Sequence, residues 1–397
     1  MDSLGASLLI HKILSLLATC YSHLATIMNE TLKYQIALTL INGLGPINGR
    51  KLLAHFGSAE AIFEQSPKSL RTIPGIGEFL ADAVLSQKEV FARAEKEIEF
   101  IERYNIQTHF FGDATYPRRL KECEDAPLLL YTKGCTDFNA GRYLAVVGTR
   151  KITPYGRDVC NALIADLAQT QPSLTIVSGL AYGVDVAAHR AALDNGLRTF
   201  GVVAHGLDQI YPSANRAVAR KMIEDGGAII TEFPSETQPI AANFVQRNRV
   251  VAGLCDAVLV VESALKGGSL ITADLANDYD RDVFAVPGRA SDVQSQGCNN
   301  LIYSNKAVLV QTAADLEKFM SWDSQPLSRA RQQELFDLLT PEEQKVIDVL
   351  HTADAVYINH LSQQSGIPLQ KLLPLLVQME FKGLVRQLPG SLYKVVN

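Results

Sequence analysis

Residues 145–150 read Ala-Val-Val-Gly-Thr-Arg, an apolar run that stops at a glycine, a hydroxyl and an arginine. A short run that is apolar throughout is typical of a buried strand in a parallel sheet. Backbone N–H groups at a glycine turn, a threonine hydroxyl and a guanidinium all donate to phosphate oxygens. The stretch therefore predicts a strand followed by a phosphate site at Gly148, Thr149 and Arg150.

Further apolar runs alternate with amphipathic stretches of helical length along the chain. The runs are residues 144–147, 174–178, 199–203, 228–231, 257–261, 283–286 and 307–310, and the amphipathic stretches include 157–169, 184–194, 214–225 and 269–279. Such alternation is typical of a mostly parallel sheet with helices on both faces. We therefore predict an α/β, Rossmann-like domain over residues 109–318, whose ligand binds beyond the carboxyl ends of the strands.

Two more glycine turns follow strands of this predicted sheet, and each precedes a helix. Their residues are Ser178, Gly179, Lys266, Gly267, Gly268 and Ser269. Because the carboxyl ends of parallel strands meet at one edge of a sheet, three such turns could follow successive phosphates of a polyanion. Each turn alone is a common feature, but the three together indicate a site for a phosphate-bearing chain.

The segment Phe-Val-Gln-Arg-Asn-Arg adds two arginines at the predicted start of a helix. Arginine is suited to bidentate phosphate contact, so Arg247, Asn248 and Arg249 are predicted to extend the site. The alternative is that these arginines pair with interior acids such as Asp256 or Glu262.

Two aromatic residues accompany these motifs. Tyr182 lies just after the second glycine turn, and Phe244 precedes the arginines. Either ring could stack on bases, as single-strand-binding proteins often require, or could belong to the core. We include both in the predicted site and leave the two interpretations open.

The composition and the missing motifs narrow the class of protein. The 397 residues suffice for two or three domains, and a net charge of −5 confines any nucleic-acid surface to a local patch. Six scattered cysteines predict neither a zinc site nor a disulfide framework, and they fit a reducing cytoplasm. The chain contains no Gly-x-x-x-x-Gly-Lys-[Ser/Thr] loop and no His-Glu-x-x-His pair. We predict a cytoplasmic protein without metal, cofactor or catalysis, in which Asp185 and His189 form a structural hydrogen bond.

The N-terminal residues 1–30 form a separate region. The apolar stretch at 8–17 contains His11 and Lys12, and it is too short to span a membrane. We expect a disordered extension or a mis-assigned start, with Met28 resembling a natural beginning; a secretory signal is the alternative.

Residues 31–108 are predicted to form a helical domain in which a short motif occurs twice. The glycine pairs at 43–45 and 75–77 each precede a helix-like stretch, as in a helix-hairpin-helix motif. Such a turn either brings backbone N–H groups to a phosphate or simply allows close helix packing. Only the first copy has neighbouring cations, Arg50 and Lys51.

The C-terminal region is predicted to be a linker, 319–338, and a winged helix, 339–397. Thr340-Pro-Glu-Glu is a capping box, two further helices follow, and a hairpin closes the chain. The third helix, Leu369 to Phe381, carries few cations, whereas a groove-reading helix needs them. We therefore favour a protein-interaction or packing role for the winged helix over DNA reading.

These segments together resemble the DNA-processing protein A family, also called DprA or Smf. The motifs, in chain order, are Val-Val-Gly-Thr-Arg, Ser-Gly-Leu-Ala-Tyr-Gly-Val-Asp-x-Ala-Ala-His-Arg, Gly-Leu-Asp-x-x-Tyr-Pro, Arg-Asn-Arg, Gly-Gly-Ser-Leu-Ile-Thr-Ala, Val-Phe-Ala-Val-Pro-Gly and Gly-Cys-Asn-x-Leu-Ile. They fall between residues 146 and 305, and the similarity extends from about residue 33 to the C-terminus.

The resemblance implies a Rossmann-like core between a sterile-alpha-motif-like N-terminal domain and a winged helix. It also implies a homodimer that binds single-stranded DNA, protects it and loads the RecA recombinase in natural transformation, without catalysis. The strand-binding residues it implies are Gly148, Thr149, Arg150, Ser178, Gly179, Arg247, Arg249, Lys266, Gly267, Gly268 and Ser269. Two residues depart from the family pattern: Tyr182 stands where many members have arginine, and Lys266 where serine is common.

Two other functions stay open. One is an enzyme, a nucleotide phosphoribohydrolase of the lysine-decarboxylase-like group, whose core is similar. Members of that group resemble one another in a Pro-Gly-Gly-x-Gly-Thr-x-x-Glu motif, which supplies a catalytic glutamate. The comparable turn of this chain lacks both Gly-Thr and the glutamate, and Asp274 is a poor substitute because its placement differs. The other is a protein-only adaptor that uses the winged helix while the sheet is merely structural.

Overall fold

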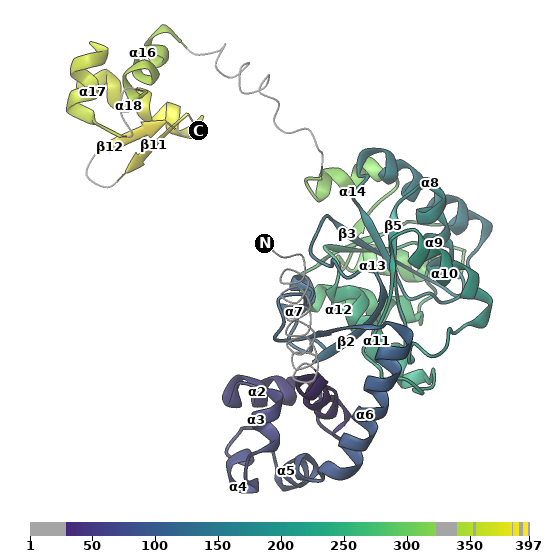
Figure 1. The fold of residues 1–397 in the computed structure, drawn as a ribbon. Helices are drawn as coiled ribbons and strands as arrows, with labels where there is room; N and C mark the ends of the chain where they lie inside the picture. Colours follow the sequence, from purple (N-terminus) through teal and green to yellow (C-terminus); the bar gives the residue numbers. More distant parts are fainter. Residues whose placement is uncertain (1–28, 323–339, 352–354, 383, 389–391, 396–397) are drawn as a thin grey trace, which may run out of the picture. The chain divides into compact units, whose positions relative to one another are not determined.

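The computed structural model describes residues 29–322, 340–351, 355–382, 384–388 and 392–395. The chain divides into two compact units, the first ending at Trp322 and the second beginning at Asp323 (Figure 1). The predicted N-terminal extension up to residue 28 and the predicted linker from residue 323 onward lie outside the described residues. Within the described ranges, no helix combines the length and the apolar character that a membrane span requires.

A nine-stranded sheet runs through the first unit in the order β1-β2-β6-β5-β4-β3-β7-β8-β9. Its strands are β1 (Gln107–Phe110), β2 (Leu129–Gly134), β3 (Tyr143–Val147), β4 (Thr175–Ser178), β5 (Arg198–Val202), β6 (Ala228–Thr231), β7 (Ala257–Val260), β8 (Asp282–Ala285) and β9 (Val308–Leu309). Every pair from β6 to β9 is parallel, whereas β1 and β2 pair antiparallel at one edge. The predicted mostly parallel sheet is confirmed.

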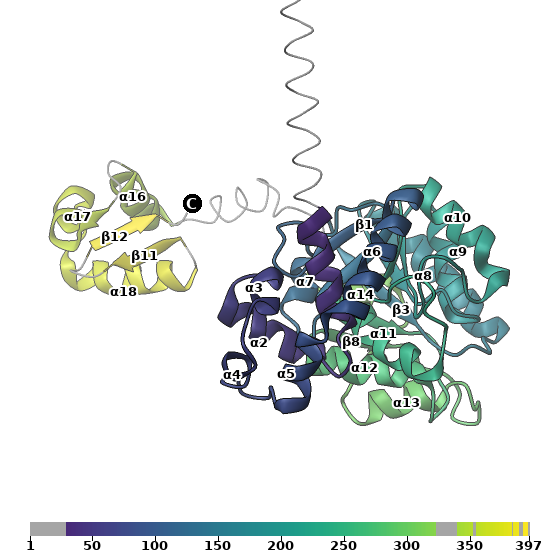
Figure 2. The same cartoon turned by 60° about the horizontal axis from the view of Figure 1, so that its bottom comes forward.

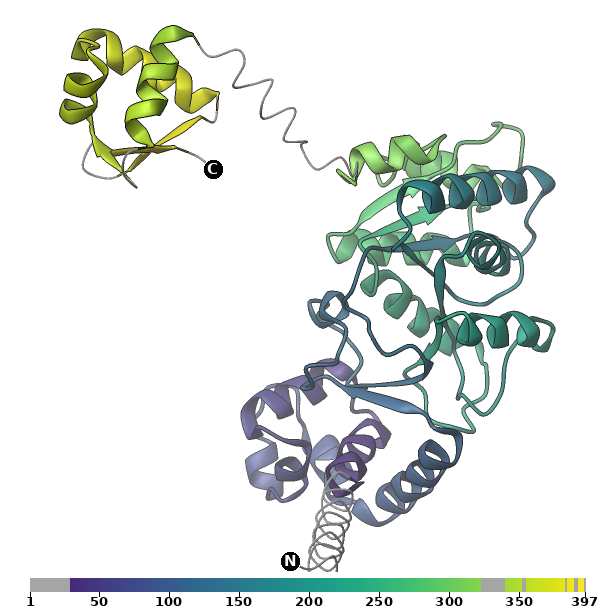
Figure 3. The same cartoon turned by 45° about the horizontal axis from the view of Figure 1, so that its top comes forward.

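Helices cover both faces of this sheet (Figures 1 and 3). They are α7 (Arg118–Lys121), α8 (Pro154–Thr170), α9 (Val184–Asp194), α10 (Arg216–Glu224), α11 (Ala241–Gly253), α12 (Gly268–Asp278), α13 (Gln296–Tyr303) and α14 (Ala313–Phe319), with a 3-10 turn η1 (Ser213–Asn215). Since side chains alternate along a strand, β3 feeds two cores. Leu144 and Val146 pack with α8 and α9, and Ala145 and Val147 pack with α11 and α12.

The order of the strands places a topological switch beside β3. The chain runs outward from β3 through β4 and β5 to β6, and then crosses back to add β7 on the other side of β3. Loops after β3 and β7 therefore leave in opposite directions and open a crevice at their carboxyl ends, where open α/β sheets bind ligands.

The helical part of the first unit packs against β1 and β2, at one edge of the sheet (Figure 2). Its helices are a segment at 29–40, α2 (Pro46–Phe56), α3 (Ala59–Phe63), α4 (Pro67–Leu70), α5 (Glu78–Leu85) and α6 (Gln87–Tyr104). The cations beside the first glycine pair face protein. Arg50 donates to the carbonyl oxygens of Cys123 and Glu124, both at 2.6 Å, and Lys51 donates to the carbonyl of Pro74 at 3.4 Å. These contacts favour the packing interpretation of the glycine turns.

The first unit extends further than the sequence predicts. The linker is predicted from residue 319, yet the Trp322 side chain is buried in the core that contains α8 and α14. The Trp322 carbonyl accepts hydrogen bonds from Arg142 and Gln171, each at 2.9 Å. Burial of the Trp322 side chain thus keeps residues 319–322 in the first unit. The sequence predicts a linker here because polar residues follow this single tryptophan.

The described residues of the second unit form three helices and a three-stranded sheet in the order β10-β12-β11. Its elements are α16 (Pro341–Leu350), β10 (Val356–Tyr357), α17 (Ile358–Ser365), α18 (Leu369–Phe381), β11 (Val385–Leu388) and β12 (Leu392–Val395). The predicted capping box is present, because Thr340 and Glu343 exchange side-chain to backbone hydrogen bonds. The winged-helix arrangement is confirmed, and β10 is a strand that the sequence did not predict.

Candidate functional site

A pocket of about 490 Å3 lies at the crevice beside β3. Ten of the fourteen predicted site residues line it: Gly148, Thr149, Arg150, Gly179, Phe244, Arg247, Asn248, Gly267, Gly268 and Ser269. The remaining four, Ser178, Tyr182, Arg249 and Lys266, do not. The structure therefore brings the three glycine turns and one end of α11 around a single cavity, and it excludes some of the residues expected there.

The turn after β3 presents an available cation. The backbone N–H of Thr149 donates to the Glu262 carbonyl at 2.7 Å, which ties the turn to the end of β7. The Arg150 side chain is exposed, and its guanidinium lies 5.0 Å from the centroid of the Phe244 ring. Arg150 makes no hydrogen bond or ion pair within the described part of the chain, so its charge is free to meet an anion.

The turn after β4 is already occupied by a carboxylate of the protein. The N–H groups of Gly179 and Ala181 donate to Asp185 Oδ2 at 3.1 and 3.4 Å. Ser178 is buried, and its hydroxyl donates to the Val146 carbonyl at 2.6 Å. The backbone donors that the sequence predicts for a phosphate at this turn are therefore bound by Asp185, six residues after Gly179.

Arg247 lines the pocket as a buried side chain and does not extend into solvent. Only 5% of the residue is exposed, and its Nη1 donates to the carbonyls of Gly179, at 2.6 Å, and Val202. A Cβ at Gly179 would lie 2.2 Å from that nitrogen, so glycine is required for this close approach. Burial lowers the pKa of Arg247 to about 10, partly offset by the nearby Asp185 carboxylate. Its charge adds to the positive potential of the pocket. Its Nη1 is engaged by the two carbonyls, whereas its Nε is buried without a hydrogen-bond partner among the described residues.

Arg249 points away from the pocket. It forms a buried ion pair with Glu232 and also donates to the Asp125 carbonyl. The acids that the sequence suggested as partners are engaged elsewhere: Asp256 pairs with Arg119 at 2.5 Å, and Glu262 accepts from Thr153. Phosphate binding by Arg249 is thus a prediction that the geometry does not support, since an interior carboxylate already neutralises it.

The third turn leads into a helix that begins without a cap. Gly267 precedes α12 and supplies no side-chain hydrogen bond, so the first N–H groups of this 11-residue helix need other partners. A Cβ at Gly268 would meet no atom within 4 Å, which leaves the helix start open toward the pocket. The Ser269 hydroxyl donates to Ser263 at 2.9 Å, and Lys266 is exposed outside the pocket. The helix start combines free donors with the positive end of the helix dipole, which suits an anion.

Comparison with known proteins agrees with this architecture. The family model for DNA recombination-mediator protein A matches residues 107–321, and models for a DprA winged helix and a SAM-like helix-hairpin-helix tandem match 329–391 and 36–87. The chain belongs to this family. Protein Smf of Synechocystis sp. is 33% identical over 293 residues, which are 71% of each chain. DNA processing protein DprA of Streptococcus pneumoniae is 42% identical over 51% of this chain and 71% of its own. The X-ray structure of DprA from that organism superimposes with a TM-score of 0.62 at 33% identity, covering 72% of this chain and 96% of that one.

One aromatic side chain, Phe244, lines the pocket, and a second, Tyr211, contacts it from outside the lining. Phe244 is half-buried between the guanidinium of Arg150 and the ring of Tyr211, whose centroid lies 5.9 Å away. Tyr211 is 44% exposed, and the sequence analysis missed it, although it stands in the Gly-Leu-Asp-x-x-Tyr-Pro motif. Tyr182, where many members have arginine, is 48% exposed but lies outside the pocket lining.

The histidines nearest the site act structurally. His189 is buried and hydrogen-bonded to Thr199 Oγ1 at 2.6 Å rather than to Asp185, and burial lowers its pKa to about 3. His205 is also buried, accepting from the Tyr211 backbone N–H at 3.1 Å. The predicted Asp185–His189 hydrogen bond is therefore wrong, because each side chain has a closer partner on its own side of α9.

The acids in and around the pocket are equally engaged. Burial raises the pKa of Asp185, the carboxylate among the lining residues, while its Oδ2 accepts two backbone N–H groups. Asp274, the nearest sequence counterpart of a catalytic glutamate, pairs with Lys306 at 2.8 Å and does not line the pocket. Across the described residues, no group of three His, Cys, Asp or Glu side chains is arranged to hold a metal ion.

Proposed function

We propose that this protein binds single-stranded DNA by its phosphates in the pocket beside β3, and so acts in DNA processing during transformation and recombination. The observation that carries the proposal is that one cavity is lined both by the exposed Arg150, which pairs with no acid among the described residues, and by the uncapped start of α12. A guanidinium and a helix N-terminus both favour an anion, and together they can hold one or two phosphates of a chain. The names of the pneumococcal relative and of the family model, a DNA processing protein and a recombination mediator, agree with this substrate.

The finer part of the proposal follows from family membership. The protein would protect incoming single strands, load RecA onto them and work as a homodimer that presents two pockets. It would do so in the cytoplasm and without catalysis, cofactor or metal. In this scheme Arg150, Gly267, Gly268, Ser269 and Asn248 would contact the strand, while Gly148, Thr149, Ser178, Gly179, Arg247 and Arg249 would shape the site. Lys266 and Tyr182 would contact the strand only outside the pocket.

A single strand fits this site better than a duplex for a geometric reason. An unpaired strand can turn its phosphates into this cavity and splay a base outward, whereas a duplex holds its phosphates and bases in a fixed helix. Phe244 and Tyr211 offer ring faces on which an unpaired base can stack, and every base has such a face. We therefore expect a preference for single strands with little dependence on sequence.

Fluorescence anisotropy with a labelled oligothymidylate tests the proposal. The wild type should bind tightly, prefer the single strand over its duplex, and lose affinity as salt rises. Arg150→Ala should weaken binding without changing the unfolding midpoint, because that side chain is exposed and unpaired. A folded wild type that binds no oligonucleotide would overturn the assignment.

The alternative is a nucleotide phosphoribohydrolase, which would use the same pocket for a nucleoside monophosphate. A hydrolase of that kind needs a carboxylate free to act on the ribose, and the Asp185 carboxylate in the lining is held by backbone donors. Assay of nucleoside monophosphates for released base, with Asp185→Asn as the control, distinguishes the two functions. Release of base that depends on Asp185 would favour the enzyme.

A further inference from the structure

We propose that the bound strand leaves the pocket over the Gly148–Arg150 turn and continues along a basic groove between α8 and α9. This inference rests on the proposed function and adds a second, separate part of the DNA-binding site. The groove has a volume of about 390 Å3. Its lining residues include Ile152, Arg157, Asn161, Gly183, Arg190 and Asp194.

The groove begins where the pocket ends. Gly183 lines the groove, and a Cβ built there would lie 2.1 Å from the Thr149 carbonyl and 2.7 Å from Arg150 Cα. Its backbone, with φ at +80°, is therefore pressed against the turn that presents Arg150 to the pocket. Since no side chain stands between them, a strand that crosses Arg150 reaches the groove directly.

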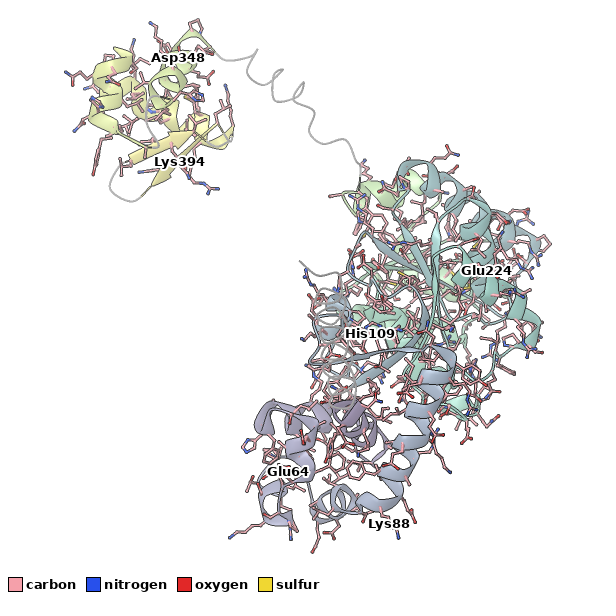
Figure 4. The ribbon with its side chains drawn as sticks, viewed as in Figure 1. Glu64, Lys88, His109, Glu224, Asp348 and Lys394 are labelled. Atoms are coloured by element: carbon pink, nitrogen blue, oxygen red, sulfur yellow. The ribbon has the colours of Figure 1, made fainter. Side chains whose placement is uncertain are left out.

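Unpaired cations mark the path. Arg150, Lys151, Arg157 and Arg190 are all exposed, and none makes a side-chain hydrogen bond or an ion pair with another described residue. By contrast, several exposed cations elsewhere in the first unit are paired, as Arg220 is with Glu224 on α10 at 2.8 Å. Figure 4 labels Glu224. Cations that lack acidic partners leave their full charge for a ligand, and a row of them suits successive phosphates.

The arrangement of the two helices orders the contacts along the groove. Both α8 and α9 begin at the carboxyl edge of the sheet and pack side by side. Arg157 lies in the first turns of α8, close in sequence to the Arg150 turn, whereas Arg190 lies near the end of α9. Asp194, the acid in the lining, stands one turn beyond Arg190. The strand would therefore meet Arg157 first, then Arg190, and turn away before Asp194.

The neutral residues between the arginines fit a nucleotide chain. Asn161 is exposed and can donate to or accept from a base or sugar, and Val186, Ala187 and Ala191 form an apolar floor. The structural alternative is that the groove is only the crease between two packed helices. That alternative gives no reason for two unpaired arginines to face the crease, and it predicts that removing them leaves DNA binding unchanged.

The test compares Arg157→Ala/Arg190→Ala with the wild type over a ladder of oligothymidylates, spanning the roughly 4–16 nucleotides that single-strand sites cover. For long oligonucleotides the double variant should bind roughly five- to tenfold more weakly. The slope of log K against log salt should become shallower by about 1.4, since each phosphate contact on a single strand contributes about 0.7. For the shortest oligonucleotides, which only fill the pocket, the affinity should match the wild type.

Two matched variants serve as controls. Arg220→Ala/Lys221→Ala removes the same charge from exposed positions on α10 and should leave the length dependence intact. Arg157→Lys/Arg190→Lys keeps the charge and should restore most of the salt slope. Unfolding midpoints of all variants should equal that of the wild type, since the side chains are exposed.

The outcomes separate this inference from the proposed function. Wild-type affinity that grows with length, and a double variant that loses only the long-oligonucleotide gain, support the groove. A double variant that binds long strands like the wild type overturns the groove while the pocket stands. Equal loss on short and long strands also overturns it, because the arginines would then act on the pocket. A wild type that binds no strand removes the proposed function itself.

Discussion

The turn after β3 and the helix α11 both bring arginine to the pocket, yet the two regions use it in opposite ways. Arg150 in the turn is exposed and, among the described residues, pairs with no acid, whereas Arg247 and Arg249 in α11 are 5% and 6% exposed and donate to protein oxygens, although Arg247 Nε has no hydrogen-bond partner among those residues. A cation with no partner can gain from an arriving phosphate. A cation already paired inside the protein would have to give up its partners first, so its contribution is to the fold.

This contrast changes which substitutions report on binding. Truncating a buried, paired arginine leaves carbonyls or a carboxylate without a partner, and the protein loses stability whatever its ligand. Loss of DNA binding in an Arg247/Arg249 double alanine variant would therefore not identify a ligand contact. The exposed cations of the turn are the informative positions.

The largest effect is expected from Arg249→Ala. It leaves the Glu232 carboxylate buried without its partner, which typically costs about 3–5 kcal/mol of unfolding free energy. Urea denaturation should show a lower midpoint with an unchanged slope, and the folded fraction should still bind oligonucleotide. As a control, Arg249→Met with Glu232→Leu removes both charges and should recover much of the stability. Full stability combined with lost DNA binding would instead make Arg249 a ligand.

The second effect is a pH dependence of the unfolding free energy, caused by the buried His189 of α9. Burial lowers its pKa in the folded protein to about 3, while the unfolded chain protonates it near 6.5, so the unfolded state binds more protons below that value. Its contribution is complete above about pH 6.5 and is lost as the pH falls toward 3. At pH 5 the loss is about 2 kcal/mol relative to pH 7.

His189→Asn checks this prediction, since asparagine can keep the hydrogen bond to Thr199 without titrating. The difference in stability between wild type and variant should shrink from pH 7 to pH 5. The comparison between the two proteins cancels the opposite contributions of Asp185 and Glu232, whose pKa values burial raises. A constant difference across this range would mean that the imidazole takes up its proton as readily in the folded protein as in the unfolded chain.

The sequence predicted the sheet well because its signal is local. Each central strand is a short apolar run, and β3, which ends at Gly148, needs only its own residues to be recognised. The meeting of the three turns also followed, because parallel strands share one carboxyl edge. The ion-pair partners of the arginines could not be predicted, because they depend on contacts between distant segments. Arg249 pairs with Glu232, in the loop after β6, and not with Asp256 or Glu262.

One signal for the arginines was nevertheless present in the sequence. Residues two apart on a helix point about 200° away from each other, so Arg247 and Arg249 could not both face one pocket. The expectation that both bind phosphate required a turn or strand at that point, whereas α11 begins six residues earlier, at Ala241. The Asp185 nest had no comparable signal, because it depends on how the loop 179–184 folds back onto the start of α9.

Arg150→Ala should weaken oligonucleotide binding by about 1.5 kcal/mol, roughly tenfold, because it removes one charge-assisted contact. The unfolding free energy should stay within about 0.5 kcal/mol of the wild type, since the side chain is exposed and unpaired. Anisotropy titrations at two salt concentrations, with chemical denaturation alongside, measure both. Arg150→Lys should keep the salt dependence but lose part of the affinity. Equal losses of stability and affinity would place Arg150 in the same class as Arg249.

A smaller effect is expected at the aromatic pair of Tyr211 and Phe244. Tyr211→Leu removes an exposed ring 5.9 Å from Phe244 while keeping an apolar side chain, so stacking on a base is lost and packing is largely kept. We expect about 1 kcal/mol, roughly a fivefold weaker affinity, with an unchanged salt slope because no charge is removed. Tyr211→Trp should match or exceed the wild type. A salt slope that changes with Tyr211→Leu would show that the ring orients Arg150 rather than a base.

The smallest effect on DNA binding is expected from the second unit, where the surface of α18 differs most from the pocket. Leu369, Leu373 and Val377 lie one turn apart on α18 and are 40%, 44% and 50% exposed, so the helix presents an apolar stripe. A phosphate gains nothing from such a stripe, whereas an apolar partner surface does. Leu373→Glu in the full chain should therefore leave oligonucleotide affinity, salt slope and unfolding midpoint unchanged, all measured beside Arg150→Ala. A marked loss of affinity in Leu373→Glu would mean that the added negative charge repels DNA from α18, and the winged helix would then have to be counted as a DNA-binding surface.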